Sequence, residues 1–201
     1  MIKAVLFDFD GVLTVDKFGS TTITNYISNT CGIPLEKVQS SYYKFNKQLL
    51  LGETTHQEIW KDFCKELGRD IDYNILLDSF RYTRLDDKMI ALVKMLKENY
   101  LIGMVTDNKC DRIRTILEYR GLQPYFDVVA ISAELHSGKD SPAIFEYVLD
   151  TLKVSPGECV FIDNTEKNLV VPKQMGMSTM FYDDESRDYD VFINELEEIV
   201  L

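Results

Sequence analysis

The residues that first suggest chemistry are two aspartates, Asp8 and Asp10, which directly follow the apolar run 2–7 and precede Gly11. Two carboxylates held this close repel each other, so a nearby cation or a bound proton must offset the repulsion. The glycine allows the chain to turn away without placing a side chain beside them. The segment therefore indicates a site at which two carboxylates share a ligand.

Further polar side chains follow the other apolar runs of the chain. In open α/β sheets, ligands bind outside the carboxyl ends of the strands, so we expect these side chains to lie in one site. They are Thr14 after the first run, Thr106, Asp107 and Asn108 after the second, Lys139 in the loop after the third, and Asp163, Asn164 and Asn168 after the fourth.

These residue types predict phosphoryl chemistry. Three acids that converge without a basic partner, Asp8, Asp10 and Asp163, require a cation, and ligands that are all oxygens favour Mg²⁺. Together with Lys139 and the Thr106 hydroxyl, this ion would form a receptor for a phosphoryl group. One carboxylate would then attack phosphorus to give an aspartyl-phosphate, while the other carries a proton to the leaving oxygen.

Five short apolar runs must position these groups. They are separated mostly by amphipathic helical patterns, and short runs that are apolar on both faces are typical of parallel strands covered by helices. We therefore predict an α/β protein with a Rossmann-like, doubly wound, five-stranded parallel sheet. The runs are 2–7, 101–106, 128–132, 159–163 and 179–182.

The alternation is interrupted between the first two runs. Residues from about 17 to 84 show helical signals, such as a capping box of Thr55 and Glu58, and no strand pattern of comparable quality. We predict that residues 17–84 form a small α-helical cap inserted after the first strand, and that residues 1–16 and 85–201 form the α/β core domain.

Composition narrows the class of protein. The formal net charge of −11 over 201 residues argues against binding to nucleic acid or to an anionic membrane surface. The cysteines Cys31, Cys64, Cys110 and Cys159 are scattered, which is typical of reduced thiols and not of disulfides or zinc sites. No apolar run approaches the ~20 residues of a membrane helix. We expect a cytoplasmic protein, either a monomer or a small homo-oligomer.

Four segments of the chain resemble, in order, the motifs of the haloacid dehalogenase-like superfamily. The helical insertion between the first two motifs is similar to the cap of the subfamily that contains small-metabolite phosphatases and β-phosphoglucomutase-like proteins. The segments are FDFDGVLT (7–14), VTDN (105–108), SGKDSPAIF (137–145) and VFIDNTEKN (160–168).

The resemblance implies a role for each matching residue. Asp8 would be the nucleophile and Asp10 the general acid/base, and both would bind the metal, Asp10 through its main-chain carbonyl. Thr106 and Lys139 would hold the phosphate, and Asp163 would be a further metal ligand. In this superfamily, an acid at the position of Asp10 separates phosphatases and mutases from true dehalogenases, which lack it.

The chain departs from the family pattern at two places in the expected site. Asn164 replaces the second acid of the fourth motif, which is expected either to weaken Mg²⁺ affinity or to alter the orientation of Lys139, without removing the site. Asp107 stands where many relatives have Asn, and we expect it beside Thr106 and Lys139 among the phosphate-binding residues. Thr14, Asn164 and Asn168 are possible supporting residues, although the two asparagines could instead only cap the following helix.

The expected cap offers two possible substrate contacts, Lys44 and Lys47, which fall on one helical face. A face of this kind could bind an anionic substrate, but solvated lysines are the simpler interpretation. The histidines His56 and His136 are expected at the surface and not in catalysis.

We therefore predict a Mg²⁺-dependent phosphomonoester hydrolase that acts on a small metabolite, such as a sugar phosphate. A phosphomutase is the first alternative, although residues 10–20 lack the histidine and threonine pattern that β-phosphoglucomutase-like proteins show there. The other is a catalytically weak member that binds phosphometabolites or a protein partner, an alternative kept open by Asn164 and Asp107.

Overall fold

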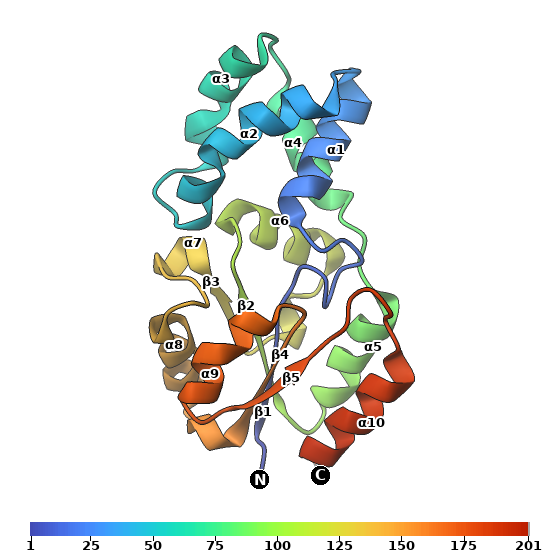
Figure 1. Cartoon of the computed structure of the whole chain (residues 1–201), viewed down its shortest axis with the longest axis vertical. Coiled ribbons are helices and arrows are strands. Elements are labelled where there is room, and N and C mark those ends of the chain that lie inside the picture. The colour runs from blue at the N-terminus through green and yellow to red at the C-terminus, as the bar shows by residue number, and fades with distance from the viewer. Residues whose placement is uncertain (201) are drawn as a thin grey trace.

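Five apolar segments form one parallel sheet in the computed structural model, which describes residues 1–200. The strand order is β3-β2-β1-β4-β5, so the first strand lies in the centre with its carboxyl end at the middle of one sheet edge (Figure 1). The predicted fold class is confirmed. The strands are β1 (Ala4–Phe7), β2 (Leu101–Thr106), β3 (Val128–Ile131), β4 (Cys159–Asp163) and β5 (Ser178–Phe181).

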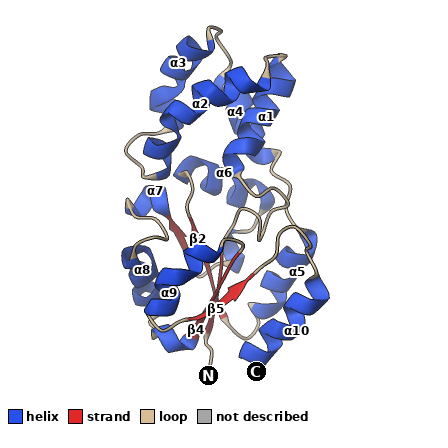
Figure 2. Cartoon of the chain, viewed as in Figure 1, coloured by secondary structure: helices blue, strands red, loops and turns tan. Residues whose placement is uncertain are grey.

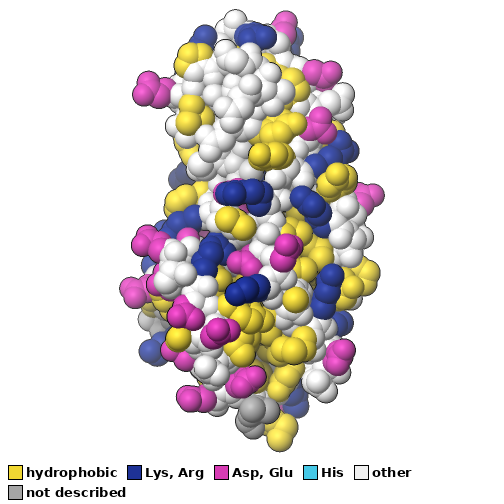
Figure 3. Space-filling model, turned by 90° about the vertical axis from the view of Figure 1, so that its right-hand side faces the viewer, with side chains coloured by type: hydrophobic (Ala, Val, Ile, Leu, Met, Phe, Trp, Pro, Cys, Tyr) yellow, Lys and Arg dark blue, Asp and Glu magenta, His cyan; other side chains and the backbone are white. Residues whose placement is uncertain are grey.

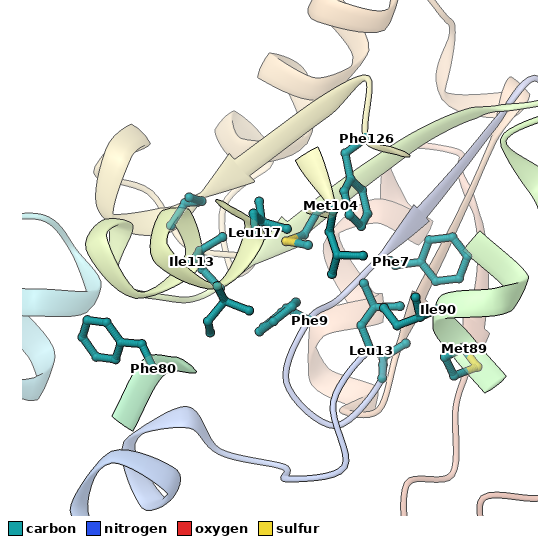
Figure 4. Close-up of a cluster of buried hydrophobic side chains, with 14 of the residues drawn as sticks. Phe7, Phe9, Leu13, Phe80, Met89, Ile90, Met104, Ile113, Leu117 and Phe126 are labelled. Carbon is teal, nitrogen blue, oxygen red and sulfur yellow. The ribbon is translucent and has the colours of Figure 1, made fainter. Parts of the chain in front are cut away.

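Alternate side chains of each strand point to opposite faces of the sheet, and both faces are buried because helices pack against each of them. Val5 and Phe7 pack into a large cluster with α5, α6 and α10, part of which is shown in Figure 4. Ala4 and Leu6 pack on the opposite face against α8. These helices are α5 (Asp87–Leu96), α6 (Cys110–Arg120), α8 (Pro142–Leu152) and α10 (Tyr189–Val200).

Gly103 lies in β2 beside Leu6 of the central strand. A Cβ atom at this position would lie 2.6 Å from Leu6 Cδ2 and 3.0 Å from Val128 Cγ1, so the neighbouring side chains would have to move. We expect Gly103→Ala to lower the free energy of unfolding by about 1–3 kcal/mol because the site is overpacked. Urea denaturation followed by circular dichroism would measure this change.

The matched control for Gly103 is Gly157→Ala, because a Cβ at Gly157 would meet no atom closer than 4.0 Å. Equal unfolding midpoints for the two variants would contradict the packing described for β2.

Four helices follow β1 and lie together at one end of the molecule, beyond the carboxyl ends of the strands (Figures 1 and 2). The predicted capping box is present, because Thr55 accepts from the main chain of Glu58 and the Glu58 side chain accepts in return. Helix α4 packs against α6 of the sheet layer. The four are α1 (Gly19–Cys31), α2 (Leu35–Leu50), α3 (His56–Leu67) and α4 (Tyr73–Arg81), and we call them the helical segment.

Short helical turns complete the chain between the strands. None of the helices within residues 1–200 has the length and hydropathy needed to span a membrane. The short elements are η1 (Gln123–Tyr125), α7 (Ser132–Leu135), η2 (Pro156–Glu158), η3 (Glu166–Leu169) and α9 (Val170–Gln174).

Candidate active site

Asp8 is the first residue after β1 and is 6% exposed. Its Oδ1 lies 2.9 Å from Nζ of Lys139. Burial raises the pKa of Asp8 to about 7, although the Lys139 ammonium lowers it and the Asp163 carboxylate raises it. Asp8 is therefore a desolvated carboxylate whose negative charge is stabilised mainly by one neighbouring lysine.

Lys139 lies in the loop before α8 and is 2% exposed. Its ammonium contacts Asp8 and also lies 2.6 Å from Asp163 Oδ2, while its main-chain N–H donates to Asp107 over 2.9 Å. Burial lowers the pKa of Lys139, but Asp8, Asp163 and Asp107 raise it, so it ends above its ordinary value. This lysine stays positively charged between the carboxylates.

Asp163 at the end of β4 is completely buried, and neighbouring donors fix its orientation. The Thr165 main-chain N–H donates to Oδ1 over 2.8 Å, and Asn168 Nδ2 lies 3.1 Å from each carboxylate oxygen. The structure therefore brings Asn168 into the site through Asp163.

Asp10 is held by Arg112, a completely buried residue in the first turn of α6. Two guanidinium nitrogens donate to the two Asp10 carboxylate oxygens, each over 2.8 Å, and Asn108 Nδ2 donates to Oδ2 over 2.7 Å. The expectation that the acids converge without a basic partner is wrong for Asp10, because Asp10 pairs with Arg112, a residue that the sequence did not indicate. The two aspartates after β1 thus have different cations.

Two hydroxyl groups close to the acids play different structural parts. Thr106 at the end of β2 is buried, and its Oγ1 accepts from Asn108 Nδ2 over 3.2 Å. Thr14 Oγ1 accepts from the Gly11 main-chain N–H over 3.0 Å and donates to the Asp16 carbonyl over 2.8 Å. Thr14 therefore stabilises the turn that carries Asp10.

Asn164 lies directly against Gly11, which has a φ of +84°. A Cβ at Gly11 would lie 2.1 Å from Asn164 Nδ2, so only glycine satisfies both the backbone conformation and this approach. The buried Nδ2 of Asn164 has no hydrogen-bond partner within residues 1–200. An unpaired buried donor is costly, so this amide nitrogen is available to donate a hydrogen bond to a ligand.

A cavity of about 530 Å³ lies between the strand ends and the helical segment. Figure 3 shows one face of the molecule, where Lys and Arg side chains gather across the middle among Asp and Glu. The cavity is lined by Asp8, Asp10, Thr106, Asp107, Asn108, Lys139, Asn164 and Asn168 from the sheet part, and by Ser20, Tyr43 and Asn46 among others from the helical segment.

The donor types of this site fit a hard divalent cation such as Mg²⁺. Asp8 and Asp163 both offer carboxylate oxygens, and both lie within hydrogen-bond distance of one ammonium group, so they face a common point. In the described part of the chain, no three His, Cys, Asp or Glu side chains form a metal cluster. A bound ion would therefore need main-chain oxygen or water as further ligands.

The two lysines expected in the cap have different surroundings. Lys44 is exposed and pairs with Glu66 of α3. Lys47 lines a second cavity of about 370 Å³, which also includes Asp107 and Asn168. Only Lys47 therefore lies close to the sequence-predicted site.

His56 is completely buried, so the expectation of a surface position is wrong, whereas His136 is exposed. Nε2 of His56 lies 2.8 Å from the Tyr42 hydroxyl, and Nδ1 of His56 lies 2.7 Å from an Asp111 carboxylate oxygen. Because His56 belongs to α3 and Asp111 to α6, this pair joins the helical segment to the sheet layer.

Sequence reasoning missed Arg112 and Lys109 as members of the site. Lys109 is 3% exposed, lines the cavity and directly precedes α6. The available signal was their place in the chain, because residues at the start of a helix after a parallel strand lie near the strand's carboxyl end.

Comparisons with known proteins identify the family and the fold. A family model described as haloacid dehalogenase-like hydrolase matches residues 2–176. Human N-acylneuraminate-9-phosphatase is 32% identical over 189 residues, which cover 82% of this chain and 75% of that protein. The fold is similar to that of HAD family enzyme bt-2542 from Bacteroides thetaiotaomicron, crystallised with magnesium and inorganic phosphate, with a TM-score of 0.76, 21% identity and coverage of 96% and 100% of the two chains.

Some relatives are much longer than this chain. Pig bifunctional epoxide hydrolase 2 is 25% identical over 225 residues, which cover 98% of this chain but 39% of that protein. The similarity to this relative therefore concerns only part of its length.

Proposed function

Because the chain belongs to the haloacid dehalogenase-like hydrolase family, we propose that it is a Mg²⁺-dependent phosphatase of small phosphorylated metabolites that works through an aspartyl-phosphate. The observation that carries the proposal is the pair Asp8 and Asp10, which share one cavity but have separate cationic partners, Lys139 and Arg112. Two carboxylates with distinct surroundings suit two distinct chemical roles.

The first half of the reaction transfers the phosphoryl group to the protein. A carboxylate oxygen of Asp8 attacks phosphorus, a new P–O bond forms, and the bond from phosphorus to the ester oxygen breaks. Asp10 in its protonated form donates a proton to that oxygen, so the product leaves as a neutral alcohol. Lys139 and the Thr106 hydroxyl bind the phosphoryl oxygens.

The second half returns the protein to its starting state. Asp10, now a carboxylate, takes a proton from a water molecule that attacks phosphorus. The bond between phosphorus and Asp8 breaks, which releases inorganic phosphate and the free Asp8 carboxylate. Arg112 acts as a positioning residue, because its two hydrogen bonds hold the Asp10 carboxylate in one orientation.

Asp8, Asp163 and the main-chain carbonyl of Asp10 would hold the Mg²⁺ ion. When bound, the ion supplies positive charge that stabilises the phosphoryl oxygens. The magnesium and phosphate in the crystals of the structurally similar bt-2542 support Mg²⁺ as the ion.

Residues 17–84 would act as the cap of this enzyme. The helical segment contributes Ser20, Tyr43 and Asn46 to the same cavity as Asp8, so a bound substrate would contact both parts of the chain. Contact on both sides excludes bulk water during the reaction and limits the substrate to small molecules. The names of phosphatase relatives, such as N-acylneuraminate-9-phosphatase, support a small phosphate ester as substrate.

The proposal is tested by measuring phosphate release from a panel of phosphometabolites with Mg²⁺ and after its removal with EDTA. We expect release from some panel members in Mg²⁺ and almost none in EDTA. Conversion of a sugar 1-phosphate to its 6-phosphate without free phosphate would instead support a mutase. No turnover of any panel member would contradict the phosphatase assignment.

Asn164→Asp is expected to strengthen Mg²⁺ binding. The substitution replaces a neutral amide, whose buried Nδ2 has no partner within the described residues, with a carboxylate beside the proposed metal ligand Asp163. An added negative charge near a cation increases its affinity, and we expect the Mg²⁺ concentration for half-maximal activity to fall by roughly tenfold. Titration of activity with MgCl₂ measures this value.

The control for Asn164 is Asn99→Asp, which adds the same charge at an exposed position outside the cavity. An unchanged Mg²⁺ requirement in Asn164→Asp would place the metal away from Asn164.

A further inference from the structure

Lys109 is a buried lysine that lines the active-site cavity and has no role in the reaction described above. Its Nζ donates a hydrogen bond to the Ser20 hydroxyl over 2.6 Å, and it lies 5.8 Å from the centre of the Tyr42 ring. Within residues 1–200, no carboxylate forms an ion pair with it, whereas Lys139 and Arg112 are both paired. Lys109 is thus the buried cation of the cavity that lacks a paired anion.

The surroundings of Lys109 make its position unfavourable for folding alone. Burial and, to a smaller extent, the Arg112 guanidinium lower the pKa of Lys109, Asp10 and Asp111 raise it, and the net result is a pKa of about 7. A desolvated ammonium whose close partners are a hydroxyl and an aromatic ring is poorly compensated. Buried charged side chains that lower the stability of the folded protein but line a cavity are typical of ligand-binding sites.

Ser20 connects Lys109 to the helical segment. The Ser20 hydroxyl accepts from Lys109 and donates to Asn46 Oδ1 over 2.8 Å, so the Asn46 carbonyl oxygen is occupied while its amide nitrogen remains a donor. Both Ser20 and Asn46 line the cavity. One wall of the cavity therefore presents an ammonium and an amide N–H, which are donors suited to an anion.

We propose that Lys109, Ser20 and Asn46 bind a second anionic group of the substrate, a carboxylate or a second phosphate, on the leaving-group side. The inference rests on the phosphatase function and narrows its substrates to acidic phosphomonoesters. Lys139 and Thr106 serve the reacting phosphoryl group, so Lys109 is available for a different part of the molecule. Because Lys109 belongs to the sheet part while Ser20 and Asn46 belong to α1 and α2, an anion bound there would also join the two parts.

Matched substrate pairs test the proposal. Glycerol 3-phosphate and 3-phosphoglycerate differ by one carboxylate, and fructose 6-phosphate and fructose 1,6-bisphosphate differ by one phosphate. We expect kcat/KM to be roughly 10- to 100-fold higher for the member with the additional anionic group in at least one pair. This is the effect expected from one charge-assisted hydrogen bond to that group. The pair that shows the preference identifies the anion. Equal values within both pairs would overturn the proposal.

For each pair, we define the ratio as kcat/KM of the member with the additional anionic group divided by kcat/KM of the member without it. Lys109→Met is expected to bring this ratio close to one. Because the substitution removes a poorly compensated buried charge, we expect the melting temperature to stay the same or rise, which separates loss of binding from unfolding. Lys61→Met, at an exposed cap position outside the cavity, is the matched control and should keep the wild-type ratio. Asn46→Ala should reduce the ratio in part. An unchanged ratio in Lys109→Met would overturn the assignment.

Binding measurements distinguish failure of this inference from failure of the phosphatase function. Asp8→Asn should bind these esters without turnover. Calorimetry should show a dissociation constant at least roughly tenfold lower for 3-phosphoglycerate than for glycerol 3-phosphate, or for fructose 1,6-bisphosphate than for fructose 6-phosphate. Lys109→Met added to this variant should remove the difference. Turnover of these esters with no preference for the member that carries the additional anionic group would disprove only the inference. Selective binding of that member without turnover in the wild type would disprove only the phosphatase function.

Discussion

Asp8→Asn is expected to abolish phosphate release, with a loss of activity on the order of 10⁴-fold or more. The substitution replaces the attacking carboxylate with a neutral amide of nearly the same shape, so the phosphoryl group cannot be transferred to the protein. The fold should remain intact, because Lys139 keeps its contact with Asp163 at 2.6 Å. Phosphate release measured on the best substrate of the panel, beside a circular dichroism spectrum, tests both statements.

The matched control for Asp8 is Asp150→Asn, which makes the same chemical change on an exposed position of α8. Its activity should equal that of the wild type. If Asp8→Asn retained more than a few per cent of the activity while Asp150→Asn behaved as expected, another group would have to be the nucleophile.

Arg112→Met is expected to have the largest effect on stability, a loss of about 3–5 kcal/mol in the free energy of unfolding. The completely buried guanidinium pairs with both oxygens of Asp10, whose side chain is 14% exposed, so its removal leaves a largely desolvated carboxylate without its cation. A Cβ at Gly19 would lie 2.3 Å from the Arg112 Cζ, which shows how closely the guanidinium packs against the start of α1. Chemical denaturation measures the loss.

Two further variants show whether the pairing with Asp10 causes this loss. Arg114→Met removes an arginine on the same helix whose pair with Glu134 is half-exposed, so we expect a loss below about 1 kcal/mol. The double variant Arg112→Met with Asp10→Asn should be more stable than Arg112→Met alone, because the unpaired charge is gone. Equal stability of the Arg112 and Arg114 variants would refute the structural account of Arg112.

Much of the fold could be predicted because it depends on local pattern. The run before Asp8 is apolar on both faces, as a central parallel strand must be, and it became β1 at the centre of the sheet. Thr55 and Glu58 formed the predicted capping box, since its hydrogen bonds join residues only three positions apart. The order and approximate bounds of the strands followed from the same kind of signal.

The site was predictable to the extent that it follows from strand ends. Parallel strands bring their carboxyl ends to one edge, so Asp8, Thr106 and Asp163 were expected together, and the structure brings them to one edge. Lys139 was also expected, through its motif, and its two ion pairs connect Asp8 with Asp163.

The tertiary structure alone decided which charges are paired. Arg112 is separated from Asp10 by 102 positions, and His56 from Asp111 by 55, so no periodic pattern could reveal either contact. No sequence pattern distinguishes Lys109 from an ordinary loop lysine either. Its burial against Ser20 of the helical segment is visible only in the structure. Sequence by itself determined the order of the elements and the types of group at the strand ends, because these depend on neighbours along the chain. Burial and pairing of charge depend on neighbours in space, and only the packed helices and sheet decide them.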